Sequence, residues 1–322
     1  MDVLDLINSL IIFLNVGFFS TIVARFTGAN MTMLILCALL YAGAAPLEAA
    51  GIMMTYIVFM RLTMYTQHYP VSYKNFHFFR GRRLAIPVVF ILVGLFFYPF
   101  AALAVFLLFF ISELFYRIYT DMPRERRMPA KDLAVRAAAA SLIMGAALAV
   151  VQFIPDTIYY GVAGTAILLI CAFFWWVGQN RRRPADAWDG VILASFLPAG
   201  LFGFDLSDWL EDMRRTTACS RLAWNLPFIF LPAFMVCFIL ANALFGIFSF
   251  SGLVLTFFSA LAIRLFGYYQ VSGRGKTNVI AVAVTVMGGV MLFLTAPEVT
   301  GISHAIDVVL PAQPVANLFD LF

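Results

Sequence analysis

Apolar runs long enough to cross a bilayer recur along the whole chain, and they constrain its fold more than any other feature. A transmembrane helix needs about 20 consecutive, mostly apolar residues. Because 63% of the 322 residues are hydrophobic and only 12% are charged, a single buried core could not hide this much apolar surface. The runs do not alternate in polarity as the strands of a membrane barrel do. The sequence therefore predicts an all-α, polytopic transmembrane helical bundle. The apolar segments, each bounded to within a few residues, lie at about 6–24, 29–45, 47–66, 84–98, 100–118, 133–152, 157–178, 187–204, 225–246, 251–269 and 277–296.

The basic residues are gathered in short loops between these segments, and this pattern indicates an orientation. Cytoplasmic loops of membrane proteins carry an excess of Lys and Arg. Four loops should therefore be cytoplasmic, and the net charge of +4 is explained without a nucleic-acid partner. The loops are those that contain the basic residues of 74–83, 124–131, 181–183 and 274–276.

One apolar segment should fail to cross, because three crossings between the third and fourth basic loops would place the fourth loop on the wrong side. The best candidate is 187–204, which contains Asp189 and whose second half should be broken by Pro198, Gly200 and Gly203. Non-helical backbone at membrane depth is tolerated where it lines a cavity within the protein. This segment is therefore expected to be re-entrant.

A short pattern, Arg-Leu-x-x-Tyr-x-Gln, occurs twice, each time where an apolar segment gives way to a basic loop. The first copy, RLTMYTQ, begins at Arg61, and the second, RLFGYYQ, begins at Arg264. Aligning the copies and walking backward places 6–24 beside 187–204, so 6–24 is expected to be re-entrant too. The alternative is that helix ends at the interface converge on Arg, Tyr and Gln without duplication. Duplication predicts two parallel repeats related by an axis along the membrane normal, a symmetry known among transporters.

These inferences divide the chain into four parts. We expect about nine crossing helices plus two re-entrant segments, with a cytoplasmic amino terminus and the carboxyl terminus outside. The parts are a first transmembrane repeat at 1–100, central helices with basic cytoplasmic loops at 101–186, a second transmembrane repeat at 187–296 and an extracytoplasmic tail at 297–322.

The order of motifs resembles that of the TauE/SafE sulfite exporter family, also called the TSUP family of anion transporters. GFFSTIVARFTGAN (17–30), YAGAAPLEAAGIMMTYIVFMRLTMYTQ (41–67) and RGRRLAIPVVFILVGLFF (80–97) follow the order of that family's repeat. LAIRLFGYYQVSGRGKTNVIAVAVTVMGGVMLF (261–293) is similar to its closing pair of helices. The glycine run of the family is replaced here by ARFTGAN and FGFDLSD. The resemblance thus implies the family's fold, with different chemistry where the substrate is held.

Charged residues inside apolar segments are the first candidates for a substrate site, since each costs about 2.5–3.5 kcal/mol at the middle of a span. Arg61 and Arg264 each have a tyrosine four residues on, Tyr65 and Tyr268, on the same helical face. They could attract or hold an anion. The alternative is that these long side chains only snorkel to water.

A second set of candidates lies at the expected tips of the two re-entrant segments. A broken helix leaves backbone N–H groups without intrahelical partners, and an anion near the membrane midplane could accept from them. A plain helix cap with a nearby snorkelling Arg25 is the alternative. The full set of candidate substrate-binding residues is Gly17, Ser20, Thr21, Arg25, Asn30, Arg61, Tyr65, Pro198, Gly200, Arg264 and Tyr268.

The expected function is secondary transport of a small sulfur-containing or organic anion, such as sulfite, thiosulfate or a sulfonate. We expect export across the cytoplasmic membrane of a bacterium, with a proton or a sodium ion as the coupling ion. The sequence is compatible with either a monomer or an oligomer. No nucleophile with its base, metal cluster or phosphate cradle indicates an enzyme, a metal or a cofactor. The main alternative is a non-transporting membrane subunit or scaffold, and a more distant one is an enzyme acting on lipid.

Overall fold

The computed structural model describes most of the helical part of the chain. Of the described residues, 88% are helical and none lies in a strand, which confirms the all-α prediction. The expected segment 84–98 and the tail 297–322 lie mostly or wholly outside these residues. The described residues are 10–68, 85, 88–89, 91–92, 99–179, 185–207, 209–210, 224–245, 250–266 and 279–295.

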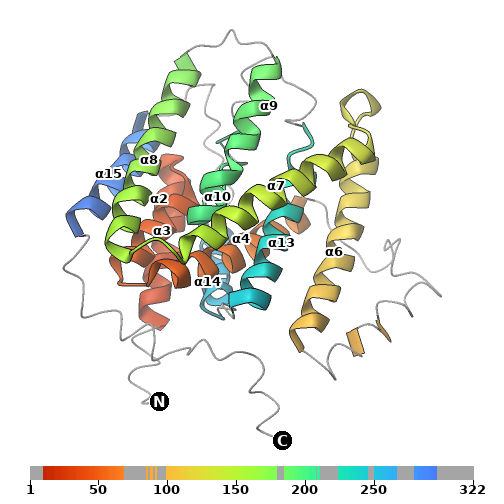
Figure 1. The fold of residues 1–322 in the computed structure, drawn as a ribbon, viewed down its shortest axis with the longest axis horizontal. Helices are drawn as coiled ribbons and strands as arrows, with labels where there is room; N and C mark the ends of the chain where they lie inside the picture. Colours follow the sequence, from red (N-terminus) through yellow and green to blue (C-terminus); the bar gives the residue numbers. More distant parts are fainter. Residues whose placement is uncertain are drawn as a thin grey trace, which may run out of the picture.

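The helices fall close to the expected apolar segments (Figure 1). The first described helix, Leu10–Thr27, includes a π-helical turn and the α-helix that follows it. In chain order the elements are η1 (Asn15–Phe19), α2 (Ser20–Thr27), α3 (Met31–Tyr41), α4 (Pro46–His68), α6 (Pro99–Asp121), the 3₁₀ turn η4 (Arg124–Arg126), α7 (Ala130–Val151), α8 (Asp156–Gln179), α9 (Ala185–Ala194), α10 (Phe196–Phe202), α13 (Pro227–Phe245), α14 (Phe250–Phe266) and α15 (Val279–Thr295).

Four of the described helices are long and apolar enough to cross a membrane. They are Leu10–Thr27, Pro46–Tyr65, Ala130–Val151 and Ile158–Trp176. Large apolar side chains such as Leu142 and Leu169 are exposed on them, as lipid-facing residues would be. The fold is therefore that of a helical protein suited to a membrane, whereas nine crossings and two repeats remain predictions.

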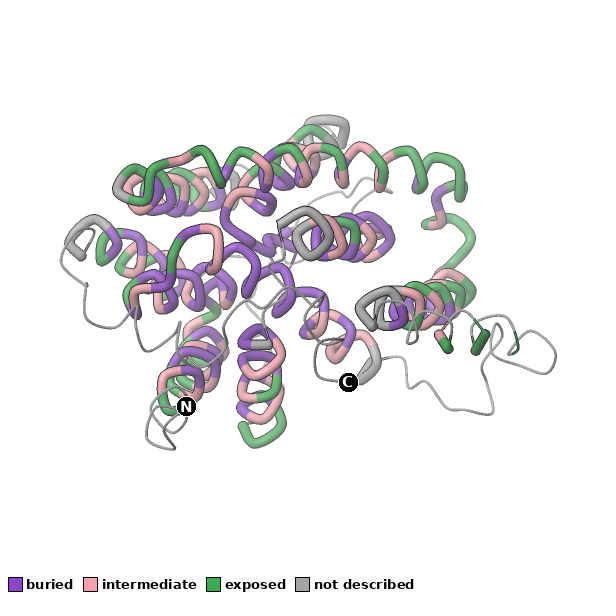
Figure 2. Tube along the Cα trace, turned by 60° about the horizontal axis from the view of Figure 1, so that its bottom comes forward, coloured by how far each residue is buried: buried purple, intermediate pink, exposed green. Residues whose placement is uncertain are grey.

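Helix α4 lies at the centre of the bundle. Of its candidate span, 67% is buried, against 28% to 33% in the other three. It packs against α14 and α13, while α7 packs against α13 and α10, and α15 joins α8 to α3. Figure 2 shows buried residues concentrated in the interior of this assembly, and α6 stands at one side of it in Figure 1. Residues on α4 are thus well placed to form a site that is shielded from solvent.

The two segments expected to be re-entrant have different backbones. The second passes from α9 to α10 at Ser195, whose N–H donates to the Val191 carbonyl at 3.0 Å and whose carbonyl accepts from the Ala199 N–H at 3.3 Å. Its backbone therefore stays helical through Pro198 and Gly200, where we expected a break, and the helix ends at Gly203. The first is continuous through Gly17 and Ser20, where we expected a break. A π-helical turn there keeps the chain helical, and the Ser20 N–H donates to the Gly17 carbonyl. The expected row of unpartnered N–H groups at 17–20 is therefore wrong for the first segment.

Both segments nevertheless end in the same way. Gly28 follows α2 with a φ of 77°, and Gly203 follows α10 with a φ of 66°. These left-handed conformations favour glycine and commonly terminate helices. A non-helical stretch follows each glycine, at 28–30 and 203–206. The likeness agrees with pairing the two segments, but superposition of the two halves stays a prediction.

Candidate functional site

The two non-helical stretches meet through a closed set of buried hydrogen bonds. The Asn30 side-chain amide donates to the Asp205 carbonyl at 2.9 Å, and the Asp205 N–H donates to Thr32 Oγ1 at 2.8 Å. Thr32 Oγ1 in turn donates to Asn30 Oδ1 at 2.8 Å. Asn30 Oδ1 also caps α3 by accepting from the Met33 N–H at 3.1 Å. Side chains thus replace the hydrogen bonds that regular structure would supply, and they fix Asp205 against the start of α3.

An ion pair between Arg61 and Asp205 lies beside this junction. Arg61 Nε donates to Asp205 Oδ2, and the side chains are only 11% and 3% exposed. Asp205 Oδ1 accepts from the N–H and the hydroxyl of Ser207, at 3.0 and 2.6 Å. Buried charges are costly unless they are paired and hydrogen-bonded, and both conditions hold for this carboxylate. A charged centre is therefore stable at the crossing of α4 with the chain that follows α10.

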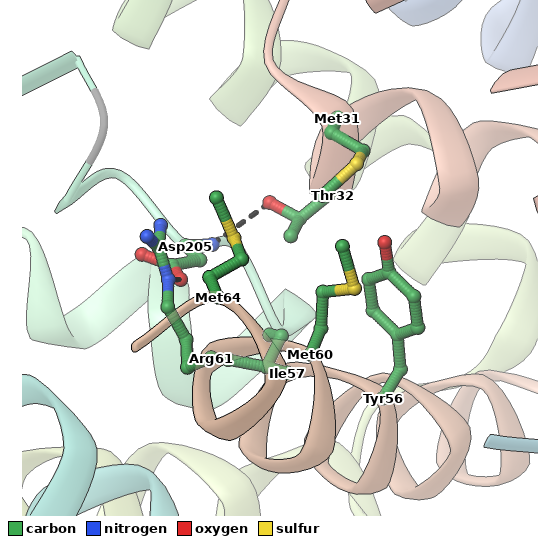
Figure 3. A pocket seen from close by; sticks show the side chains of 8 residues that line it. All are labelled: Met31, Thr32, Tyr56, Ile57, Met60, Arg61, Met64 and Asp205. Carbon is green, nitrogen blue, oxygen red and sulfur yellow. Dashed lines mark hydrogen bonds and ion pairs between the residues drawn. The ribbon is translucent and has the colours of Figure 1, made fainter. Parts of the chain in front are cut away.

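A small pocket adjoins the ion pair (Figure 3). In Figure 3, Thr32 lies across the pocket from the α4 side chains, and Asp205 lies against the Arg61 head group. The space that the centre of a water molecule can occupy is about 10 Å³, which is room for roughly one water. A sulfite-sized anion would need a wider opening than this conformation has. The lining residues are Met31, Thr32, Tyr56, Ile57, Met60, Arg61, Met64 and Asp205.

Of the expected substrate-binding residues, the structure brings Asn30 and Arg61 together at Asp205. Gly17 and Thr21 contact each other, since the Thr21 hydroxyl donates to the Gly17 carbonyl at 2.6 Å. Tyr65 is half-buried one turn after Arg61 on α4. Arg61 and Tyr65 lie on α4, which lines the pocket, whereas Gly17 lies in η1 and Thr21 in α2, neither of which contributes a lining residue.

Other expected residues lie elsewhere. Arg25 and Ser20 are half-buried on α2, and Pro198 is half-buried on α10. Gly200 packs against α7, where an added Cβ would lie 2.4 Å from the Met144 carbonyl oxygen. Its geometry indicates close helix packing rather than contact with an anion.

The two arginines of the repeated pattern have unlike surroundings. Arg61 is paired with Asp205, whereas Arg264 is exposed in the last turn of α14. Tyr268 lies outside the described residues. The pattern is therefore repeated in the sequence, but the two arginines do not occupy equivalent surroundings.

Sequence reasoning missed the residues that complete the site. Asp205 lies in FGFDLSD, which stands where the resembled family has a glycine run, and an acidic residue there calls for a basic partner. Tyr56 and Ser207 carry no signal beyond being polar groups in or beside apolar segments. One signal in the sequence could have identified the partner of Arg61: Asp205 is an acidic residue that directly follows the apolar segment 187–204.

Comparison of the chain with protein-family models, with curated proteins and with solved structures finds no match. The likeness to the sulfite exporters therefore rests on its motifs alone.

Proposed function

We propose that this protein is a secondary transporter of a small anion and that Arg61 is the residue to which the anion binds. The observation that carries the proposal is the buried Arg61–Asp205 pair beside a pocket where two non-helical stretches meet. Ionisable residues inside membrane proteins are costly and commonly mark the path of a substrate. Non-helical backbone in such proteins commonly lines a cavity. A scaffold needs neither feature.

Asp205 acts in this scheme as a resident anion that the substrate displaces. When Arg61 leaves, Oδ1 of Asp205 keeps both hydrogen bonds from Ser207, so the carboxylate is not stranded. When the substrate leaves, Asp205 returns and again places its negative charge beside the Arg61 guanidinium. Loaded and empty forms are thereby kept close in free energy. A transporter needs this balance, because it must release what it binds.

The pocket has the means to widen. Met31, Met60 and Met64 line it, and methionine is an unbranched side chain that repacks readily around irregular shapes. Its polarizable sulfur also suits a soft anion. These properties favour sulfur-containing anions such as sulfite or thiosulfate, which the motif resemblance also suggests. We place the protein in the cytoplasmic membrane of a bacterium with its amino terminus inside.

A flux screen in proteoliposomes tests the proposal. Purified protein is reconstituted and loaded with sulfite, thiosulfate, an alkyl sulfonate or a carboxylate, under proton and sodium gradients of either direction. We expect at least one class to move faster than in empty liposomes and in liposomes with heat-inactivated protein. Folded protein that moves none of them under any gradient would refute transport and favour the scaffold.

A further inference from the structure

Three buried hydroxyl groups and one backbone carbonyl gather where η1, α4 and α14 meet. The Gly17 carbonyl accepts from the hydroxyl of Thr21 at 2.6 Å and from that of Ser259 at 3.1 Å. The Tyr56 hydroxyl lies beside those of Thr21 and Ser259. All three side chains are 0% exposed. The cluster is therefore a compact set of neutral oxygen atoms sealed inside the protein.

The Tyr56 hydroxyl has no hydrogen-bond partner of acceptable geometry within the described part of the chain. An unsatisfied buried polar group costs about 1–3 kcal/mol. Such groups in native proteins commonly mark the place of a water or an ion. Something that offers this hydroxyl an interaction is thus expected to occupy the cluster.

The π-helical turn η1 explains how the oxygens come together. π-Helical turns are rare in proteins, and those that occur often lie at functional sites. An added Cβ on Gly17 would lie 3.1 Å from the Leu255 carbonyl oxygen, so glycine at this position allows α14 to approach closely. That approach brings Ser259 to the Gly17 carbonyl.

We propose that this cluster is a sodium site formed by the Gly17 carbonyl and the hydroxyls of Thr21, Tyr56 and Ser259. Backbone carbonyls in unwound parts of helices coordinate Na⁺ in secondary transporters, and we assign the same role to the Gly17 carbonyl in the π-helical turn η1. Calcium prefers carboxylates, and the described residues contain no group of three or more His, Cys, Asp or Glu suited to a metal. When Thr21 turns a lone pair to the ion, its proton retains an acceptor in Met31 Sδ at 3.6 Å.

The position of the cluster suggests how sodium would be coupled to the anion. Tyr56 and Met31 also line the pocket beside Arg61, so the cation and the anion would share a wall. Opposite charges attract strongly in a poorly polarizable interior. Each ion should raise the affinity for the other by the same factor. This coupling rests on the proposed function, whereas the sodium site itself does not.

Thermal unfolding of the purified full chain in detergent tests the site without any transport. Buffers of constant ionic strength replace choline chloride with NaCl or KCl. We expect NaCl to raise the Tm in a saturable way and KCl to raise it much less, because a ligand that binds only the native state stabilises it. Equilibrium binding of radioactive ²²Na⁺ to the wild-type chain should saturate and needs no variant.

Variants of the cluster test whether Na⁺ binds there. Thr21→Val, Tyr56→Phe and Ser259→Ala should each weaken Na⁺ binding by at least about tenfold, and Thr21→Ser should retain it. Thr285→Val is the matched control, because Thr285 is 1% exposed and donates to the Ala281 carbonyl at 2.8 Å on α15. This control should bind Na⁺ as the wild type does.

Equal Tm shifts with NaCl, KCl and choline chloride, or the absence of saturable ²²Na⁺ binding to the wild type, would overturn the site and leave water as the occupant. Equal loss in Thr285→Val would also overturn it. Anion flux without Na⁺ binding would leave the proposed function standing and remove the site. Na⁺ binding without flux of any anion would leave the sodium site standing and refute the proposed transport function.

Discussion

Removal of one member of the Arg61–Asp205 pair should destabilise the protein far more than removal of both. Arg61→Gln leaves the Asp205 carboxylate, 3% exposed, without its counter-charge. Breaking a buried pair in this way costs roughly 3–5 kcal/mol. Asp205→Asn removes the carboxylate that pairs with the Arg61 guanidinium, and its cost should fall near the lower end because Arg61 is 11% exposed. The double variant carries neither charge, so we expect a coupling free energy of about 2–3 kcal/mol.

The free energy of unfolding of the four proteins can be compared by equilibrium titration with SDS from mixed micelles, followed by far-UV circular dichroism. Arg264→Gln is the control, because Arg264 is exposed, and it should change the free energy by less than about 0.5 kcal/mol. If the effects of the two single substitutions add to within about 0.5 kcal/mol in the double variant, Arg61 and Asp205 are not energetically coupled. The geometry of the site would then be wrong.

Two further predictions concern packing and topology. Gly200→Ala should lower the free energy of unfolding by about 1–3 kcal/mol, since its Cβ would lie 2.4 Å from the Met144 carbonyl oxygen. Gly190→Ala is the control and should be neutral or stabilising, because nothing lies within 4 Å of an added Cβ. Equal effects of the two substitutions in the SDS titration would contradict the α7–α10 contact. Single cysteines at Asp2 and at Asp320 should react with an impermeant thiol reagent from opposite sides of the membrane, and labelling of both from one side would exclude the expected topology.

The sequence was a good guide to where helices lie, because a bilayer imposes a length on each apolar run. The segment expected at 133–152 is the helix Ala130–Val151, and that expected at 47–66 is Pro46–His68. Local composition was sufficient for these features. The end of the segment 187–204 at Gly203 was also foreseen, but Pro198 and Gly200, which were expected to break the same segment, lie within the helix α10.

The site needed information that local sequence does not hold. Arg61 was identified as a costly charge, but its partner Asp205 is 144 residues away and is brought to it only by the packing of the chain after α10 on α4. Asn30 was expected to face an anion, and it holds the Asp205 backbone instead. The break expected at Gly17 is a π-helical turn, since a change of hydrogen-bond register has no distinctive residue pattern.

The most direct test of the central claim compares anion transport by Arg61→Gln and Arg264→Gln in proteoliposomes, once the flux screen has identified a transported anion. Circular dichroism and size-exclusion chromatography confirm that each variant is folded, and Arg61→Gln/Asp205→Asn serves if the single Arg61 variant is not. Losing a hydrogen bond to a charged group costs about 1.5–3 kcal/mol, which is roughly a tenfold to hundredfold change in affinity. We predict that the KM of the Arg61 variant rises by at least about tenfold, while that of Arg264→Gln stays within about threefold. An unchanged KM in a folded Arg61 variant would show that the anion does not bind at Arg61.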